Sequence, residues 1–264
     1  MKRWNLPLIS QNSHYIIVNK PCGVLCQPPD IRTWYRHHNY DPPVLTELLI
    51  EQYGNDWRNE LRSVHRLDKD VTGGVLVACN KNAAAKFSTN LAYGGNRGFK
   101  FIRRYVAVVS GEMINNIPNE GRILMGDTVS DYKRLYPNLL ILQLGTGRKH
   151  QIRRLLRDVF KQPIKNDVKF GASLVSGIGP VIGLHSGFIS TQIGLKKESH
   201  LIPIPSDVGT LKLWHKYIDN KGNFSTVIAE TLCGFQIPDS LDQELKLTGL
   251  EDTTIFYRSK IDSF

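Results

Sequence analysis

Cysteine is scarce in this 264-residue sequence, and the four cysteines have neither the number nor the spacing of a disulfide framework. Cys22 and Cys26 lie close together, but no second close pair follows them to complete a zinc site. We therefore expect reduced thiols and no bound metal. A chain of this length can bury a hydrophobic core without either kind of cross-link.

Long uninterrupted apolar segments are also missing. The first apolar cluster, Tyr15 to Val18, is too short for the core of a secretory signal. Residues 170–195 carry no Lys, Arg, Asp or Glu, but glycines recur through them and Pro180 interrupts them. A membrane helix needs a denser apolar core. This stretch therefore predicts a loop followed by a buried strand, and no membrane partner is expected.

Acidic residues are outnumbered by basic ones. The sequence has 34 Lys and Arg against 24 Asp and Glu, which gives a net charge of +10. Such a surplus favours a polyanionic partner, either a nucleic acid or an acidic membrane surface. The hydrophobic share of 41% and the charged share of 22% are typical of folded globular proteins and exclude a disordered chain.

The order of apolar runs and turn residues predicts the fold class. Apolar runs predict strands at 15–19, 74–79, 105–109 and 139–144. Helices are expected at 45–53, at 83–91 after an Asn80 cap, and at 147–161, whereas four prolines mark 27–43 as an exposed loop. Strand mostly follows strand, so we predict an α+β fold. It would be a single domain over residues 1–264, with a mixed, mostly antiparallel sheet flanked by helices and loops.

The helix expected at 147–161 combines an apolar face with an unusual start. Its apolar residues recur at helical spacing, which leaves Arg153 on the flank, where a long side chain can reach into a cleft. Arg148, Lys149 and His150 crowd the expected first turn, where the helix dipole disfavours cations. Their position makes sense if an anion lies in front of them, such as a phosphate or a buried carboxylate.

A second charged segment precedes the expected strand at 74–79. Asp68 and Asp70 lie two residues apart and are flanked by Arg66 and Lys69. Such a segment forms either a salt-bridged turn or an active-site loop at a strand end, and the residues alone do not decide between the two. For Asp70 only the structural interpretation is supported.

The sequence His65-Arg66-Leu67-Asp68 followed by Thr72-Gly73 resembles the signature of the RluA-type pseudouridine synthases. Further groups resemble family elements in the same order: Asn19-Lys20-Pro21-x-Gly23, the strand Arg103-x-Tyr105-x-Ala107-x-Val109-x-Gly111, the block from Thr146 to Arg153, Pro163-Ile164, Asp167, Phe170-Gly171 and Leu184-His185-Ser186. The resemblance extends from about residue 14 to about residue 205. Asn166 stands where the family has Gly, and Lys149 where it has Thr.

The resemblance implies an RNA pseudouridine synthase catalytic domain with no metal and no cofactor. Asp68 would be the catalytic carboxylate, and Arg153 its buried partner. Tyr105 would stack on the flipped uracil and help to remove the C5 proton. His65 would hold the loop, and Arg66, Arg148, Lys149 and His150 would contact RNA. Glycoside hydrolases need two carboxylates, whereas uracil leaves as a delocalised anion, so a single Asp suffices.

Three features look most like the family members that modify mitochondrial large-subunit rRNA in yeasts: Arg32-Thr33-Trp34, the sequence Val71-Thr72-Gly73-Gly74, and residues 201–205. This similarity implies mitochondrial rRNA as partner and a mitochondrial location, although no clear presequence is visible. We expect a monomer without an S4-like RNA-binding domain. Two alternatives stay open: an N-glycosylase-type hydrolase acting on a flipped base, and a non-catalytic RNA-binding ribosome-assembly factor.

Overall fold

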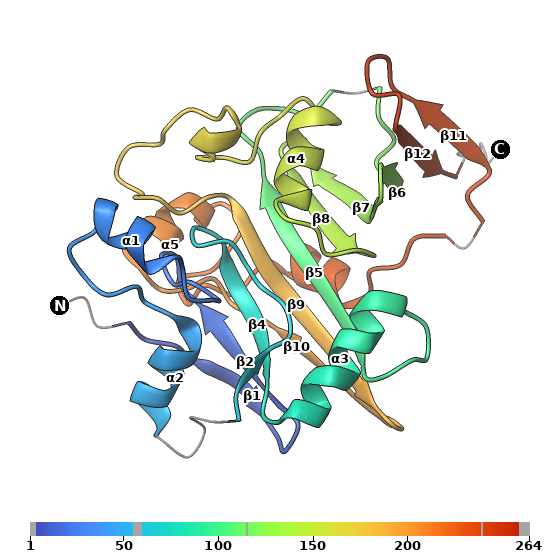
Figure 1. The fold of residues 1–264 in the computed structure, drawn as a ribbon. Helices are drawn as coiled ribbons and strands as arrows, with labels where there is room; N and C mark the ends of the chain where they lie inside the picture. The colour runs from blue at the N-terminus through green and yellow to red at the C-terminus, as the bar shows by residue number, and fades with distance from the viewer. Residues whose placement is uncertain (1–3, 55–59, 115, 239, 259–264) are drawn as a thin grey trace.

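The computed structural model describes residues 4–54, 60–114, 116–238 and 240–258. Within these residues one 12-stranded sheet runs through the protein in the order β1-β2-β4-β9-β5-β8-β7-β6-β12-β11, with β10 paired to β9 and β3 to β4 (Figure 1). The strands of its first half are β1 (Leu8–Gln11), β2 (Tyr15–Lys20), β3 (Arg62–Ser63), β4 (Thr72–Ala78), β5 (Lys100–Val108) and β6 (Glu120–Met125). The others are β7 (Thr128–Tyr136), β8 (Leu139–Leu144), β9 (Leu184–Ile193), β10 (Lys196–Leu201), β11 (Gln243–Lys246) and β12 (Thr253–Tyr257).

The predicted fold class is confirmed. Among the named strands of the described residues, every pairing is antiparallel except that of β4 with β9. The helices are α1 (Ile31–His37), α2 (Leu45–Tyr53), α3 (Lys81–Tyr93), α4 (Gln151–Asp158), α5 (Val208–Trp214), α6 (Thr226–Cys233) and the 3₁₀ helix η2 (Val168–Phe170). None of the helices in this part of the chain is long and apolar enough to cross a membrane. That residues 1–264 form one domain stays a prediction.

Two predicted elements were wrong in extent. The segment 27–43 is not all loop, because it contains α1: Asp30 caps the helix by accepting a hydrogen bond from the backbone N–H of Thr33, and the prolines lie outside it. The helix predicted at 147–161 is shorter. His150 has φ of 57°, a left-handed conformation, so α4 begins only at Gln151. Arg148, Lys149 and His150 thus precede the helix instead of forming its first turn.

The sheet has a different core on each face, because side chains alternate along a strand. From β5, Tyr105 and Ala107 pack into the cluster that also holds the apolar face of α4, while Val106 and Val108 pack with residues of α5 and α6. The predicted apolar side of α4 is confirmed, since Leu155 and the residues that share its face are buried. This alternation places Tyr105 on the same side of the sheet as α4.

The parallel contact between β4 and β9 fixes the loop that precedes β4. Gly73 has φ of 114°, and a Cβ atom at this position would stand 2.5 Å from the carbonyl oxygen of Ser186, so only glycine fits. The neighbouring Thr72 hydroxyl lies 2.8 Å from Nδ1 of His185, whose Nε2 contacts the carbonyl of Ile202. The loop that carries Asp68 therefore emerges from the middle of the sheet at a fixed point.

Candidate active site

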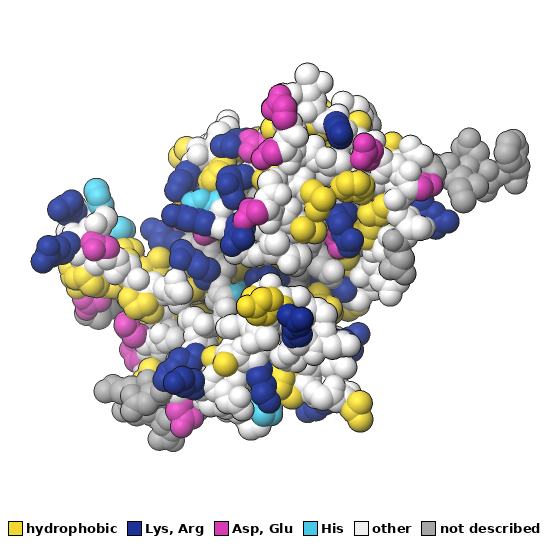
Figure 2. All heavy atoms as spheres, turned by 45° about the vertical axis from the view of Figure 1, so that its right-hand side comes forward, with side chains coloured by type: hydrophobic (Ala, Val, Ile, Leu, Met, Phe, Trp, Pro, Cys, Tyr) yellow, Lys and Arg dark blue, Asp and Glu magenta, His cyan; other side chains and the backbone are white. Residues whose placement is uncertain are grey.

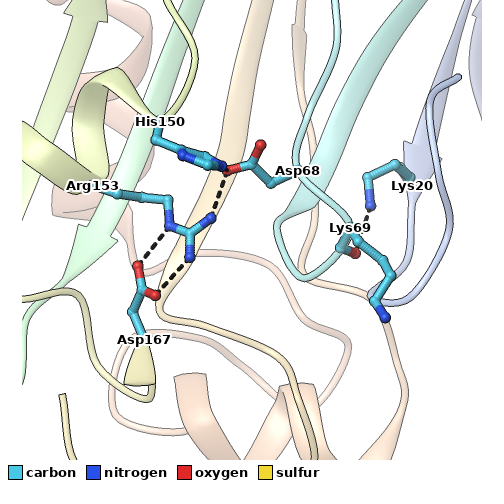
Figure 3. Close-up of polar contacts among 6 residues, drawn as sticks. All are labelled: Lys20, Asp68, Lys69, His150, Arg153 and Asp167. Atoms are coloured by element: carbon cyan, nitrogen blue, oxygen red, sulfur yellow. Dashed lines mark hydrogen bonds and ion pairs between the residues drawn. The ribbon is translucent and has the colours of Figure 1, made fainter. Parts of the chain in front are cut away.

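The loop from His65 to Val71 joins β3 to β4 and is held by buried polar contacts. Nε2 of His65 accepts a hydrogen bond from the backbone N–H of Leu76 (2.9 Å), as expected for a residue that holds the loop. Burial, assisted by the nearby charge of Arg103, keeps the pKa of His65 well below its ordinary value. Lys20, fully buried, donates to the carbonyl of Lys69 (3.2 Å) beside Asp68 (Figure 3).

Arg153 lies between two carboxylates that come from different segments. Its Nη1 donates to Oδ2 of Asp68 (2.8 Å), while Nε and Nη2 donate to the two carboxylate oxygens of Asp167 (2.7 Å each) (Figure 3). The guanidinium also packs over the ring of Phe170, 4.5 Å from its centre. Burial opposes the charge of Arg153, but the hydrogen bonds to Asp167 and Asp68 outweigh it and raise the pKa of Arg153. Arg153 is therefore a cation held in one orientation.

His150 approaches the same carboxylate from the turn before α4. Its Nε2 lies 3.7 Å from Oδ2 of Asp68, beyond hydrogen-bond distance. Burial, together with the cations Arg153, Lys169 and Lys149, lowers the pKa of His150 although Asp68 acts in the opposite direction. His150 is thus a neutral side chain at pH 7. Of the three residues that precede α4, His150 lies near the carboxylate of Asp68 and Arg148 pairs with that of Asp127, and a phosphate in front of them stays a prediction.

A cavity of about 670 Å³ opens beside this group. Asp68 and Arg153 line it, and so does Tyr105, which is only 4% exposed. Burial raises the pKa of the Tyr105 hydroxyl, against the opposing effect of the Arg103 guanidinium. The cavity thus combines a half-buried carboxylate, a fixed cation and an aromatic ring.

The mouth of the cavity is basic. Figure 2 shows Lys and Arg side chains beside a hollow in this face. Arg66 and Lys149 are exposed there, and Arg66 donates to the side chain of Gln27 (3.0 Å). Arg148 is also exposed but forms an ion pair with Asp127 (2.6 Å). All of the residues predicted for the site therefore border one cavity, with Arg153 hydrogen-bonded to Asp68, His150 close to the same carboxylate, and Arg66, Arg148 and Lys149 exposed.

Sequence reasoning missed two neighbours of this site as functional candidates. Asp167 was recognised only as part of a family element. Nothing else in the sequence indicated that it pairs with Arg153. Arg103 was recognised only as the first residue of the strand motif and as part of the basic stretch 97–104, which was expected to contact the RNA backbone, yet it lines the cavity and is 7% exposed. In the described part of the chain no group of three His, Cys, Asp or Glu side chains is arranged to hold a metal ion. The absence of a metal or cofactor stays a prediction.

The sequence profile of the family described as RNA pseudouridylate synthase matches residues 14–158, which include the loop of Asp68 and both β5 and α4 up to its last residue. The chain belongs to the RNA pseudouridylate synthase family. It is 52% identical over 248 residues to the 21S rRNA pseudouridine(2819) synthase of Eremothecium gossypii, an alignment that covers 94% of this chain and 95% of the relative. The protein of the same name from Saccharomyces cerevisiae is 42% identical over 243 residues, covering 86% of this chain and 95% of the relative.

Solved structures of pseudouridylate synthases share the fold. The human RNA pseudouridylate synthase domain containing 1 protein aligns with a TM-score of 0.58 and 19% identity, over 89% of this chain and 97% of the human chain. The human protein named RNA pseudouridylate synthase domain containing 4 aligns with a TM-score of 0.57 and 20% identity. The alignment covers 79% of this chain and 92% of the human chain. The prediction of a pseudouridine synthase, an isomerase that acts on RNA, is confirmed. Neither the hydrolase nor the non-catalytic alternative receives support.

Proposed function

We propose that this pseudouridine synthase isomerises one uridine of the mitochondrial large-subunit rRNA. The printed name of relatives at 52% and 42% identity, 21S rRNA pseudouridine(2819) synthase, supports this target, and the uridine would be the counterpart of the one in that name. The location would be mitochondrial, since that rRNA is made and assembled there. The enzyme would act as a monomer without a membrane partner.

We further propose that Asp68, Tyr105 and Arg153 carry the reaction. The observation that supports this assignment is the fixed ion pair between Asp68 and Arg153 at the edge of a cavity that Tyr105 lines. A carboxylate out of water needs a partner to stay ionised, and Arg153 provides it. Asp68 is 22% exposed, so one side of its carboxylate is accessible from the cavity.

In this proposal the target uridine leaves its stack and places its base against Tyr105, a general device of enzymes that act on bases. Asp68 then faces the ribose. Two routes need only one carboxylate: attack on C1′, or removal of a ribose proton. In both routes the glycosidic bond breaks, the uracil turns, and C5 joins C1′. Tyr105 stacks on the base and assists the loss of the C5 proton.

The cations at the cavity mouth would hold the RNA backbone. Lys149 and Arg66 are exposed and form no ion pair among the described residues, whereas Arg148 would have to exchange Asp127 for RNA. His150 is neutral at pH 7, so we assign it a hydrogen bond to RNA instead of a charge contact. Phosphate contacts of this kind make RNA affinity fall as salt rises.

The experiment that tests the target uses purified protein and transcripts of the mitochondrial large-subunit rRNA. Carbodiimide treatment followed by primer extension should give one new stop, at the counterpart of the uridine in the relatives' name, and Asp68→Asn should give none. Tritium release from RNA with 5-tritiated uridine should persist in the presence of a chelator. A stop at another position, or no stop, would refute the proposed target. Release of free uracil would instead identify a hydrolase.

A further inference from the structure

Arg103 is a buried cation for which the described residues supply no negative partner. It is 7% exposed, and none of the ion pairs found there includes it. Its Nε is buried without a hydrogen-bond acceptor. Burying a guanidinium without a carboxylate is costly. The contrast with Arg153, which lies in the same cavity and has two carboxylates, indicates that Arg103 meets an anion that arrives with the substrate.

The surroundings of Arg103 place it at the inner wall of the cavity. Arg103 and Tyr105 lie two residues apart on β5 and therefore point to the same side of the sheet, where both line the cavity. The guanidinium stacks over the ring of Phe101, 5.4 Å from its centre. Both of its terminal nitrogens lie 3.7 Å from where a Cβ atom of Gly147 would stand, so its outer edge faces the turn before α4.

Among the described residues no neighbour offsets this charge. Burial keeps the pKa of His65 well below its ordinary value, so His65 adds no negative charge, and Nε2 of its ring accepts from the backbone N–H of Leu76. Phe101 and Tyr105 offer ring faces and a hydroxyl, which contact a cation without neutralising it.

Depth in the cavity indicates which anion Arg103 meets. The phosphodiester chain enters and leaves across the protein surface, where it meets exposed cations such as Lys149 and Arg66. Only a flipped base reaches the inner wall beside Tyr105. The anion expected at Arg103 is therefore on the base and not on the backbone.

We propose that Arg103 and Tyr105 form the uracil subsite, and that the Arg103 guanidinium binds a uracil carbonyl oxygen and stabilises the uracil anion formed during the reaction. This inference rests on the proposed function of the same cavity. When the C1′–N1 bond breaks, its electron pair stays with the ring and is shared by N1 and the two carbonyl oxygens. The pair is used again when C5 bonds to C1′. C5 then loses a proton and N1 gains one, so no other reactant is needed.

The test compares Arg103→Met and Arg103→Lys with the wild-type enzyme and with Lys149→Gln. The readouts are single-turnover tritium release at saturating enzyme, RNA affinity at two salt concentrations, and the melting temperature. Removing a donor that stabilises a developing anion costs about 100- to 1,000-fold in rate. We expect Arg103→Met to lose at least about 100-fold in the single-turnover rate constant, with Kd changed by less than about 3-fold and its salt dependence unchanged. Lys149→Gln should instead raise Kd and flatten the salt dependence.

Stability distinguishes this role from a structural one. Replacing an unpaired buried cation by an apolar side chain of similar size is neutral or stabilising, so Arg103→Met should melt no lower than wild type. Arg103→Lys, which keeps the charge but not the planar fork, should recover part of the lost rate. If Arg103→Met melts at a lower temperature than wild type, Arg103→Lys provides the test. The inference then requires that Arg103→Lys melts at the wild-type temperature and still has a lower rate constant than wild type.

Three results would overturn the inference. A rate constant within 3-fold of wild type in Arg103→Met would show that no anion is stabilised there. A raised Kd with a flatter salt dependence would make Arg103 a phosphate contact. If the rate constant of Arg103→Lys falls only when its melting temperature also falls, the role of Arg103 is structural. Wild-type tritium release in the same assay separates these failures from failure of the proposed function, because a wild-type enzyme without release would refute both.

Discussion

Asp167 binds Arg153 through both of its carboxylate oxygens, and this leaves a single nitrogen of Arg153, Nη1, for Asp68. The orientation of the guanidinium is therefore set by Asp167, which is 1% exposed. A long side chain on the flank of a helix has many rotamers, and a two-point ion pair selects one of them. Asp167 thus acts on the site through Arg153 and not by touching the substrate.

Asp167→Asn should lower both stability and turnover. Removing one partner of a buried ion pair costs about 3–5 kcal/mol of unfolding free energy, and here it also releases Arg153 from its fixed orientation. We expect the single-turnover rate to fall while RNA affinity stays close to wild type. Urea unfolding and tritium release measure the two effects. Asp158→Asn is the matched control, because its ion pair with Arg157 on α4 is exposed and worth less than about 1 kcal/mol. Equal losses in the two variants would contradict the role given to Asp167.

Arg153→Ala should separate catalysis from binding. Arg153 is buried and paired with Asp68, so its loss should lower turnover far more than RNA affinity. Lys149 is exposed at the cavity mouth, so Lys149→Gln should mainly weaken binding and reduce the salt slope by about 0.7–0.9. Filter binding at several salt concentrations and single-turnover rates check both statements. An effect of Arg153→Ala on affinity alone would make Arg153 a phosphate contact.

The sequence allowed prediction of those features that depend on local pattern. The apolar runs predicted β2, β4, β5 and β8, and Asn80 was found at the expected cap of α3. The flank position of Arg153 and its contact with Asp68 could be inferred because helical spacing relates a side chain to one face. Family resemblance supplied what the pattern alone left open, namely that the loop of Asp68 belongs to a site.

Other features depend on contacts between distant segments or on single backbone angles. Nothing local indicates that His150 turns left-handed and delays α4, since residues other than glycine rarely do so. Asn166 is a partial exception: it replaces the family's Gly, has φ of 66°, and uses its amide to bind the carbonyls of Gly179 and Val181. The burial of Arg103 could not be predicted, because the basic stretch 97–104 that contains it is typical of an exposed surface that contacts the RNA backbone.

Because of His185, the free energy of unfolding should fall as the pH is lowered below neutral. It is fully buried among the rings of Trp214 and Phe224, and burial lowers its pKa from 6.5 to about 3. In the unfolded chain His185 takes up a proton as the pH falls below about 6.5, whereas the folded protein does not until about pH 3. The unfolded state therefore gains stability between these values, and the protein loses about 2 kcal/mol between pH 7 and 5 through this residue.

The measurement is the unfolding free energy in urea at pH 7 and at pH 5, for wild type and for His185→Gln. The variant should be less stable at pH 7, because it loses one of the contacts to Thr72 and Ile202. Its loss between pH 7 and 5 should nevertheless be smaller by about 2 kcal/mol. His65 has the same sign of shift and is present in both proteins, so it cancels in the comparison. An identical pH dependence of the two proteins would refute the assignment.

Asp68→Asn should fold and bind RNA but have no measurable activity. Asparagine keeps the shape of the side chain and can still accept a hydrogen bond from Arg153, but it is neither a carboxylate nucleophile nor a base. Because Arg153 keeps its two bonds to Asp167, the cost in stability should be only about 1.5–3 kcal/mol, the value of a hydrogen bond to a charged group.

The variant must therefore be examined by melting, by gel shift with its RNA and by tritium release. The expected combination is a cooperative melt, a wild-type shift and no release. A drop of a thousandfold in rate corresponds to about 4 kcal/mol of activation free energy, which is the scale for loss of the reacting group. Suppose a folded, RNA-bound Asp68→Asn enzyme still turned over faster than about a thousandth of the wild-type rate. The reacting carboxylate would then lie elsewhere, and Asp70, the other acidic residue of the loop, would be the next position to substitute.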